Sequence, residues 1–208
     1  MTAKWEAIFP TPVLRANIGR EFTESELDYV RRVQQSTCQN VCNTRSIDTH
    51  VLNAREMQPL RSIIEPLVEE FCRKTVTSSE KVQFFITQSW INYTRKGQSH
   101  HRHCHTNSLV SGVLYLSAVK ELDRICFYRP PATGIAVDND GRNWYTADSW
   151  AFDVGAGDLI LFPSSLVHGV DQTVGEHLRV SLSFNTFVKG ELGSNDRLNG
   201  LSLEVSQV

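Results

Sequence analysis

The spacing of apolar residues changes near residue 80 of this 208-residue chain. Thr23 and Glu26 have the spacing of a capping box, which predicts a helix from about residue 24 to residue 35. A second helix is predicted from about residue 59 to residue 76, because its apolar residues recur at intervals of three and four and share one face; they are Leu60, Ile63, Ile64, Leu67, Val68 and Phe71. We therefore expect residues 1–80 to form a helical lead-in.

After residue 79 the pattern is typical of β-strands. Six segments are rich in β-branched and aromatic residues and are separated by turn-forming Gly, Pro, Asn and Asp; they are 82–94, 109–116, 124–128, 149–154, 158–162 and 178–188. Many short strands at regular spacing predict a sandwich or barrel. We expect one mostly β domain over residues 1–208, with about eight strands in a core at 81–190, two helices packed outside it and a C-terminal tail at 191–208.

The composition excludes several classes of protein. Lys and Arg number 21 against 23 Asp and Glu, so the basic excess of a nucleic-acid-binding protein is missing. No run of about 18 uncharged apolar residues is present, and we expect no membrane partner. The first residues lack the apolar segment of a signal peptide, and the five cysteines form no Cys-x-x-Cys pair. A cytoplasmic protein with reduced thiols is the expectation.

Four of the seven histidines lie within six residues, from His100 to His105. If this segment is extended, His101, His103 and His105 point to one side and His100 to the other. Residues two apart lie about 6.6 Å apart along a strand, so two such imidazoles can converge on one metal ion. His101 and His105, about 13 Å apart, cannot share an ion, so the pair is either His101 with His103 or His103 with His105. A solvated polar patch is the alternative interpretation.

The strand expected at 178–188 alternates between an apolar and a polar face. Arg179, Ser181, Ser183 and Asn185 share the polar face. An Arg and a Ser inside a barrel beside a metal indicate an anionic ligand, because the guanidinium fork matches a carboxylate and a hydroxyl adds another hydrogen bond. The alternative is the exposed face of an edge strand.

Two spacings resemble the metal motifs of the cupin type of double-stranded β-helix. Gly97 precedes His103 in a Gly-x5-His-x-His pattern, and Gly157 to His168 gives Gly-x5-Pro-x4-His. With three further segments, 89–92, 111–116 and 179–185, they resemble the iron(II)- and 2-oxoglutarate-dependent oxygenases. More narrowly, they resemble the family of small 2-oxoglutarate–iron oxygenases of bacteria and phages. The resemblance covers residues 82–188 and implies a jelly-roll, cupin-like barrel.

The resemblance also implies roles for individual residues. His103 matches the first iron ligand and His168 the distal one, while His105 stands where the superfamily usually has Asp or Glu. Because three-histidine iron sites occur in cupin-type thiol dioxygenases, His105 is either the third ligand or only a neighbour. Arg179 and Ser181 match residues that bind the far carboxylate of 2-oxoglutarate.

Further expectations concern the cosubstrate, the reaction and the substrate entrance. Tyr93 precedes His103 by ten residues, where some family members place a tyrosine that touches 2-oxoglutarate. The implied reaction uses Fe(II), 2-oxoglutarate and O2, releases succinate and CO2, and hydroxylates an unidentified substrate. We expect Trp144, Trp150 and Arg129, near a long connection, to shape the entrance, with surface packing as the alternative.

Two other functions stay open at this point. One is a cupin-type three-histidine dioxygenase or isomerase that does not use 2-oxoglutarate. The other is a non-catalytic cupin-like binding protein that keeps the barrel without the metal. A homodimer is one possible assembly.

Overall fold

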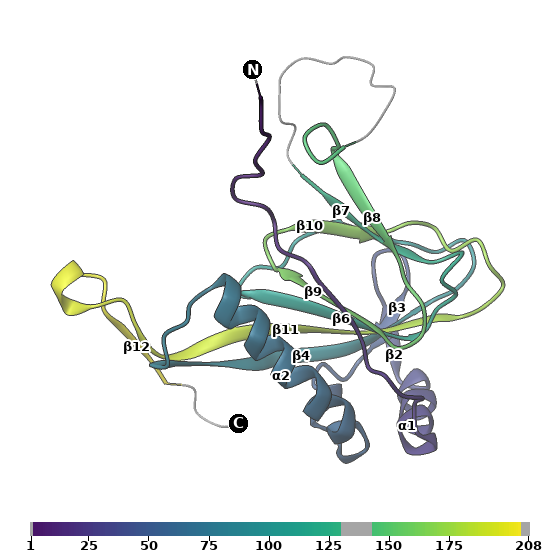
Figure 1. Ribbon diagram of the computed structural model, residues 1–208. Helices are drawn as coiled ribbons and strands as arrows, with labels where there is room; N and C mark the ends of the chain where they lie inside the picture. The colour runs from purple at the N-terminus through teal and green to yellow at the C-terminus, as the bar shows by residue number, and fades with distance from the viewer. Residues whose placement is uncertain (1, 130–142, 205–208) are drawn as a thin grey trace.

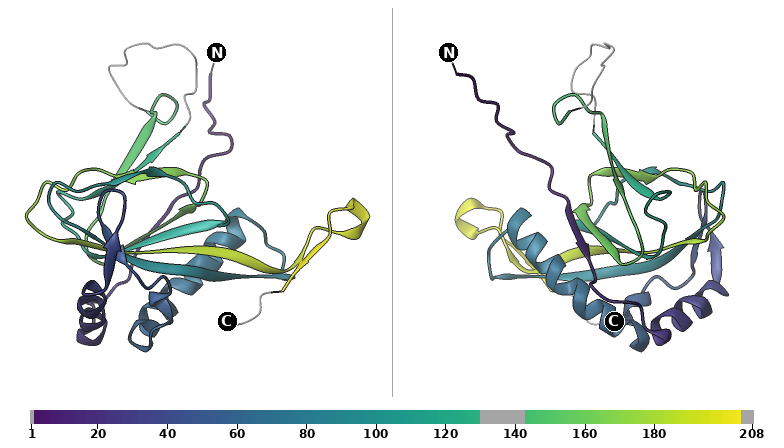
Figure 2. Two further views of the ribbon diagram at one scale, coloured as in Figure 1. Left: turned by 180° about the vertical axis from the view of Figure 1, so that it is seen from behind. Right: turned by 45° about the vertical axis from the view of Figure 1, so that its right-hand side comes forward.

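The structure is a computed structural model, and it describes residues 2–129 and 143–204. Two antiparallel sheets face each other, and two helices lie against the outer side of the larger one (Figures 1 and 2). The helices are α1 (Glu24–Gln34) and α2 (Gln58–Thr75), and short 3₁₀ helices lie at Val51–Asn53, Arg55–Met57 and Asn195–Arg197. The order of layers is therefore helices, large sheet, small sheet.

The larger sheet has eight strands in the order β1-β9-β6-β11-β4-β3-β2, and β12 pairs with β11. Its strands are β1 (Leu14–Asn17), β2 (Thr37–Gln39), β3 (Thr44–Ser46), β4 (Val82–Thr94), β6 (Val110–Ser117), β9 (Asp158–Pro163), β11 (Arg179–Leu192) and β12 (Leu201–Leu203). The smaller sheet has the order β5-β10-β7-β8. Its strands are β5 (His100–His103), β7 (Arg124–Tyr128), β8 (Ser149–Asp153) and β10 (Val167–Val170). This double-stranded β-helix arrangement confirms the expected fold class.

The helices form where the apolar periodicity predicts them. The capping box is present: the Glu26 N–H donates to the Thr23 hydroxyl over 3.2 Å, and the Thr23 N–H donates to the Glu26 carboxylate over 2.8 Å. Helix α2 continues through Pro66 and buries one apolar face against the large sheet. Among the residues that the structure describes, no helix is long and apolar enough to cross a membrane.

Alternating side chains of the central strands divide into two cores. Leu182 and Ile91 belong to the core beneath the helices, whereas Phe162 and Ile125 belong to a second core between the sheets. This division confirms the alternation predicted for the strand that begins at Arg179. The polar face of that strand is turned toward the smaller sheet, where it meets the second core.

The two ends of the chain contain strands that the sequence pattern does not reveal. Strand β1 pairs with β9 at the edge of the large sheet, and β2 and β3 form a hairpin that pairs with β4. The lead-in at 1–80 is therefore not only helical. The expected tail at 191–208 begins inside β11 and includes β12, which folds back onto β11. These strands have only three or four residues each, too few to display a period of two.

Candidate metal centre

Three histidines from two remote segments meet between the sheets. His103 ends β5 and His168 lies on β10, and the two residues are direct cross-strand partners. Their ring centroids are 4.3 Å apart. His105 lies two residues beyond β5, where its N–H donates to the Ser164 carbonyl over 2.9 Å. One ligand atom from each of the three imidazoles lies within 4.8 Å of the others, which brings together the predicted ligand set.

Hydrogen bonds fix the protonation of two of these rings. Nδ1 of His103 lies 2.8 Å from the His101 carbonyl, and Nδ1 of His168 lies 3.0 Å from the Leu166 carbonyl. A carbonyl only accepts, so Nδ1 carries the proton and Nε2 keeps a free lone pair for a metal. His105 differs, because its Nδ1 faces the amide nitrogen of Asn185 at 3.4 Å.

Burial keeps the cluster neutral. Desolvation, with a smaller contribution from the neighbouring imidazoles, lowers the pKa of His168 to about 3 and that of His105 to about 4. Desolvation also lowers the pKa of His103. A metal binds the neutral form of imidazole, so these rings need not lose a proton to bind one at neutral pH.

A β-bulge in β5 changes the direction of the first histidine. His168 lies opposite His103, but Val170 lies opposite His100, so β5 uses three residue steps where β10 uses two. The extra residue cancels the alternation expected of a regular strand. Gly169 makes room for the bulge, since a Cβ there would lie 3.1 Å from the His100 carbonyl oxygen.

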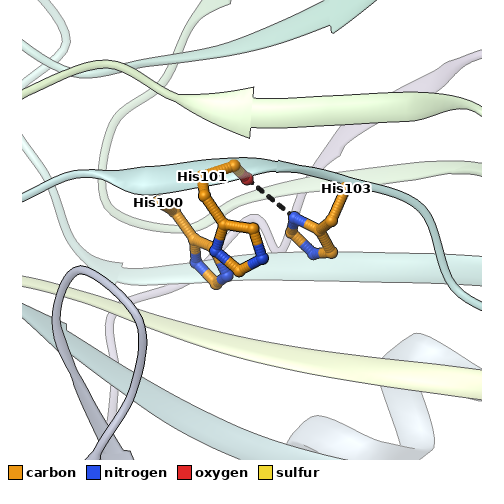
Figure 3. A group of neighbouring side chains, drawn as sticks. All are labelled: His100, His101 and His103. Carbon is orange, nitrogen blue, oxygen red and sulfur yellow. Dashed lines mark hydrogen bonds between the residues drawn. The ribbon is translucent and has the colours of Figure 1, made fainter.

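The bulge corrects the expectation that His100 points away from His103. The rings of His100 and His103 are stacked with centroids 4.8 Å apart. Figure 3 shows the rings of His100, His101 and His103 on the same side of β5. One ligand atom from each of them also lies within 4.8 Å of the others. The structure thus contains two overlapping groups of three histidines.

On one side of the cluster, an inner pocket reaches between the sheets to Arg179 and Ser181. Arg179 is buried, and its Nη1 donates to Asp123 over 3.2 Å. Asp123 also accepts from Nε2 of His177 over 2.6 Å and from the Val119 N–H over 2.9 Å. Asp123 therefore fixes the guanidinium and compensates part of its charge. No motif in the sequence indicates this role for Asp123, which lies in the turn before β7.

Tyr115 adds a second polar group to the inner pocket. It lies on β6 directly opposite Ser181, and its hydroxyl is buried without a hydrogen-bond partner among the described residues. Burial raises the pKa of Tyr115, so the phenol stays protonated. An unpaired buried hydroxyl is costly and points to a ligand that the protein is shaped to receive. A carboxylate beside Arg179, Ser181 and Tyr115 would satisfy it.

Tyr93 does not belong to this pocket, which corrects its expected role. Its hydroxyl donates to the Val30 carbonyl over 2.8 Å, and the side chain is buried in the core beneath the helices. Neighbouring Thr94, on the opposite face of β4, lines the inner pocket. Alternation along the strand therefore turns Tyr93 away from the pocket.

On the other side of the cluster, an outer pocket lies between the histidines and the segment that contains the β2–β3 hairpin. Asn40, Arg45 and Thr49 come from that segment, while Gln88 and Trp90 come from β4; Asn185 and the four histidines from His100 to His105 complete the lining. Among the described residues of this lining, Arg45 is the one with a formal charge at neutral pH. The outer pocket is therefore polar and carries positive charge.

The expected entrance residues lie elsewhere. Trp144 and Trp150 contact each other with ring centroids 5.8 Å apart, and Arg129 donates to the Tyr145 carbonyl over 2.6 Å. In the described part of the chain none of the three lines either pocket, because β8 lies at the far edge of the small sheet from β5. Their role at an entrance stays a prediction, because part of the connection that suggested it, residues 130–142, lies outside the described residues.

The donor set fits a divalent transition metal. Imidazole nitrogen suits Fe, Zn, Ni and Cu, and three ligands leave positions open for other molecules. Over residues 2–129 and 143–204, neither group of candidate ligands includes a carboxylate. The pair of Arg179 and the unpartnered Tyr115 hydroxyl independently fits an organic acid in the inner pocket.

Comparisons with known proteins agree with this fold. The chain is similar to HygX from Streptomyces hygroscopicus, solved with nickel, 2-oxoglutarate and hygromycin B, at 14% identity and a TM-score of 0.57 over 85% of this chain and 82% of that chain. It is also similar to the alpha-ketoglutarate-dependent epimerase SnoN of nogalamycin biosynthesis, at 11% identity and a TM-score of 0.59 over 86% of this chain and 81% of that chain. A third similar structure is a prolyl-4-hydroxylase from Pseudomonas putida, at 15% identity and a TM-score of 0.54 over 84% of this chain and 92% of that chain. At these identities the likeness shows a shared fold.

A search of curated proteins gives no match. Residues 88–185 match the family model described as "Putative 2OG-Fe(II) oxygenase". The matched segment contains His103, His105, His168 and Arg179. Over this segment the chain is similar to the 2OG-Fe(II) oxygenase family, an enzyme family that uses iron(II) and 2-oxoglutarate, and the shared fold agrees with that likeness.

Proposed function

We propose that this protein binds Fe(II) through His103, His105 and His168 and hydroxylates a small polar substrate at the expense of 2-oxoglutarate and O2. The observation that carries the proposal is the meeting of three neutral imidazoles at the mouth of a pocket that holds Arg179. The bound iron would supply the activation of O2. Overall, a substrate C–H becomes C–OH, and 2-oxoglutarate becomes succinate and CO2. One oxygen atom of O2 enters the new hydroxyl group and the other enters succinate.

The residues of the inner pocket bind and orient 2-oxoglutarate in this proposal. Arg179 pairs with the carboxylate far from the metal, and Ser181 and Tyr115 donate hydrogen bonds to it. Asp123 acts as a positioning residue, because it holds one edge of the guanidinium. Apolar side chains such as Ile125 and Phe162 line the same pocket and exclude water.

The outer pocket receives the substrate in this proposal. It opens onto the same histidines from the other side, so a substrate there lies next to the metal without displacing 2-oxoglutarate. Trp90 offers an aromatic face, and the amide side chains of Asn40 and Gln88 offer donors and acceptors. Arg45 favours a substrate with a negatively charged or strongly polar group.

Succinate formation tests the proposal. Protein loaded with Fe(II) without oxygen is mixed with 2-oxoglutarate and O2, and succinate and O2 uptake are measured. We expect slow succinate formation even without the substrate, and a KM for 2-oxoglutarate that rises at least about tenfold in Arg179→Ala, since a charged hydrogen bond contributes about 1.5–3 kcal/mol. Arg129→Ala, outside both pockets, is the matched control. Iron-loaded protein that binds no 2-oxoglutarate and forms no succinate would contradict the proposal.

The three-imidazole donor set favours one alternative, a dioxygenase of the cupin type that needs no 2-oxoglutarate. The same experiment separates the two functions. For that alternative, O2 uptake with its substrate proceeds without 2-oxoglutarate, and Arg179→Ala leaves the O2 uptake unchanged.

A further inference from the structure

The second group of histidines, His100, His101 and His103, forms a compact cluster on one strand (Figure 3). The ring centroids are 4.8 Å apart for His100 and His103, 4.8 Å for His101 and His103, and 5.5 Å for His100 and His101. The β-bulge in β5 creates this arrangement, because a regular strand would place neighbours 100 and 101 on opposite faces. All three residues line the outer pocket, and His101 is exposed.

His103 belongs to both groups, but it has only one nitrogen to offer. Its Nδ1 donates to the His101 carbonyl, which leaves the lone pair of Nε2. One lone pair binds one ion at a time. The two groups are therefore alternative positions for a metal, and an ion at the outer position takes His103 away from the inner one.

We propose that His100, His101 and His103 form a second divalent-metal site, which selects Zn²⁺-like ions and excludes iron from the inner centre when it is occupied. Three imidazoles and one water match the tetrahedral preference of Zn²⁺. Zn²⁺ also binds nitrogen ligands more tightly than Fe²⁺ in the usual order of affinities. Since the outer pocket has no carboxylate among the described residues that line it, the ligands of this site are the imidazoles alone.

Exposure of His101 gives an incoming ion access to the outer site from solvent. His168, one of the two ligands that belong to the inner group alone, is only 5% exposed. Zinc at the outer site also occupies part of the pocket that we propose receives the substrate. The consequence for activity rests on the proposed function, whereas the metal site itself does not.

Zinc binding to variants of the metal-free protein tests the site without any assay of activity. The double variant His105→Ala/His168→Ala removes the inner group and leaves the outer one. We expect it to bind one Zn²⁺ per chain in calorimetry. Adding His101→Ala should weaken that binding at least about 100-fold, because loss of even an outer-shell partner costs 10–100-fold in metal affinity. Adding His50→Ala, a histidine outside both groups, is the control and should change nothing.

Wild-type protein should bind one Zn²⁺ rather than two, because His103 is shared. Two ions per wild-type chain would overturn the shared-ligand argument, and a double variant that is folded but binds no Zn²⁺ would overturn the site. The proposed site would also be overturned if the double variant bound Zn²⁺ equally tightly with His101→Ala added and with His50→Ala added. If the double variant does not fold, His105→Ala alone serves, compared with and without His101→Ala, since residue 105 lies outside any strand. Failure of succinate formation would affect the proposed function but not these binding results.

Discussion

The inner and outer pockets meet at the same histidines, yet they are built differently. The inner pocket lies on the central strands β4, β6 and β11, and its cation Arg179 is buried with a carboxylate partner. The outer pocket uses a short hairpin and a bulged strand, and its cation Arg45 is only half-buried, with its Nη1 on the Ser46 carbonyl. Charges interact more strongly in the buried site, where solvent screens them less. The inner pocket is thus suited to holding one anion in a fixed position, and the outer pocket to a ligand that can bind in more than one position.

Substitution of a histidine between the two pockets should have the largest effect on iron binding and activity. His168→Ala removes the most buried ligand of the inner group. We expect Fe(II) affinity to fall at least about 100-fold and succinate formation to disappear. Anaerobic titration of Fe(II) measures the affinity. His50→Ala is the control, and an unchanged Fe(II) affinity in His168→Ala would show that the inner group is not the iron site.

Asp123→Asn tests whether the inner cation depends on its partner. It leaves Arg179 buried beside a neutral amide, and breaking a buried ion pair costs about 3–5 kcal/mol. We expect the free energy of unfolding in urea to fall by up to that amount and the KM for 2-oxoglutarate to rise. The ligand should restore part of the stability, because its carboxylate replaces the missing charge.

The size of that restoration distinguishes the two pockets. Stabilisation by 2-oxoglutarate should be weaker in Arg179→Ala and unchanged in Arg45→Ala. Equal stabilisation by 2-oxoglutarate in wild type and Arg179→Ala would contradict the assignment of the inner pocket.

Tyr115→Phe should affect stability and binding in opposite directions. The ligand-free protein loses a buried hydroxyl that has no partner among the described residues, so its stability should stay equal or rise by about 1 kcal/mol. The Kd of 2-oxoglutarate should rise roughly tenfold, since one hydrogen bond to a charged group is lost. Urea unfolding and ligand titration measure the two effects. If the ligand-free Tyr115→Phe protein were less stable than the ligand-free wild type, the hydroxyl would have a structural role.

The histidine cluster should make metal-free protein sensitive to acid. The pKa values of His168 and His105 are lowered to about 3 and about 4, against an ordinary value of 6.5. Between these values the unfolded chain binds protons that the folded chain does not, so the free energy of unfolding falls as pH decreases from 6.5 toward 4. Thermal unfolding across this range should show a shallower slope for His168→Gln than for the His50→Gln control.

Arg45→Ala should have the smallest effect in the absence of substrate. Arg45 has no carboxylate partner among the ion pairs of the described residues, and we expect stability to change by less than about 0.5 kcal/mol. Succinate formed without substrate should also stay at the wild-type rate. A large loss of either would show that Arg45 belongs to the inner machinery or to the fold.

The sequence predicts the parts of the site that depend on local spacing. Strand β4 coincides with the predicted segment 82–94, and the alternation along β11 places Arg179 and Ser181 on one face. Their convergence with the histidines needed the family resemblance, because spacing alone left two possible ligand pairs. Alternation along β4 should also have excluded Tyr93, whose neighbours Thr94 and Trp90 share the pocket face.

Other features depend on pairing between distant segments and leave no local signal. The bulge that turns His100 toward His103 is visible only in the register against β10. Asp123 reaches Arg179 across 56 residues of sequence, and Tyr115 meets Ser181 only through the pairing of β6 with β11. Residue types alone do not reveal such partners.

A crystal structure of the protein prepared without oxygen, with Fe(II) and 2-oxoglutarate, tests the central claim most directly. The account predicts one iron ion about 2.1 Å from nitrogens of His103, His105 and His168. It also predicts the far carboxylate of 2-oxoglutarate in contact with Arg179, Ser181 and the Tyr115 hydroxyl. An ion held without His168, or a carboxylate bound at Arg45 with the inner pocket empty, would contradict it.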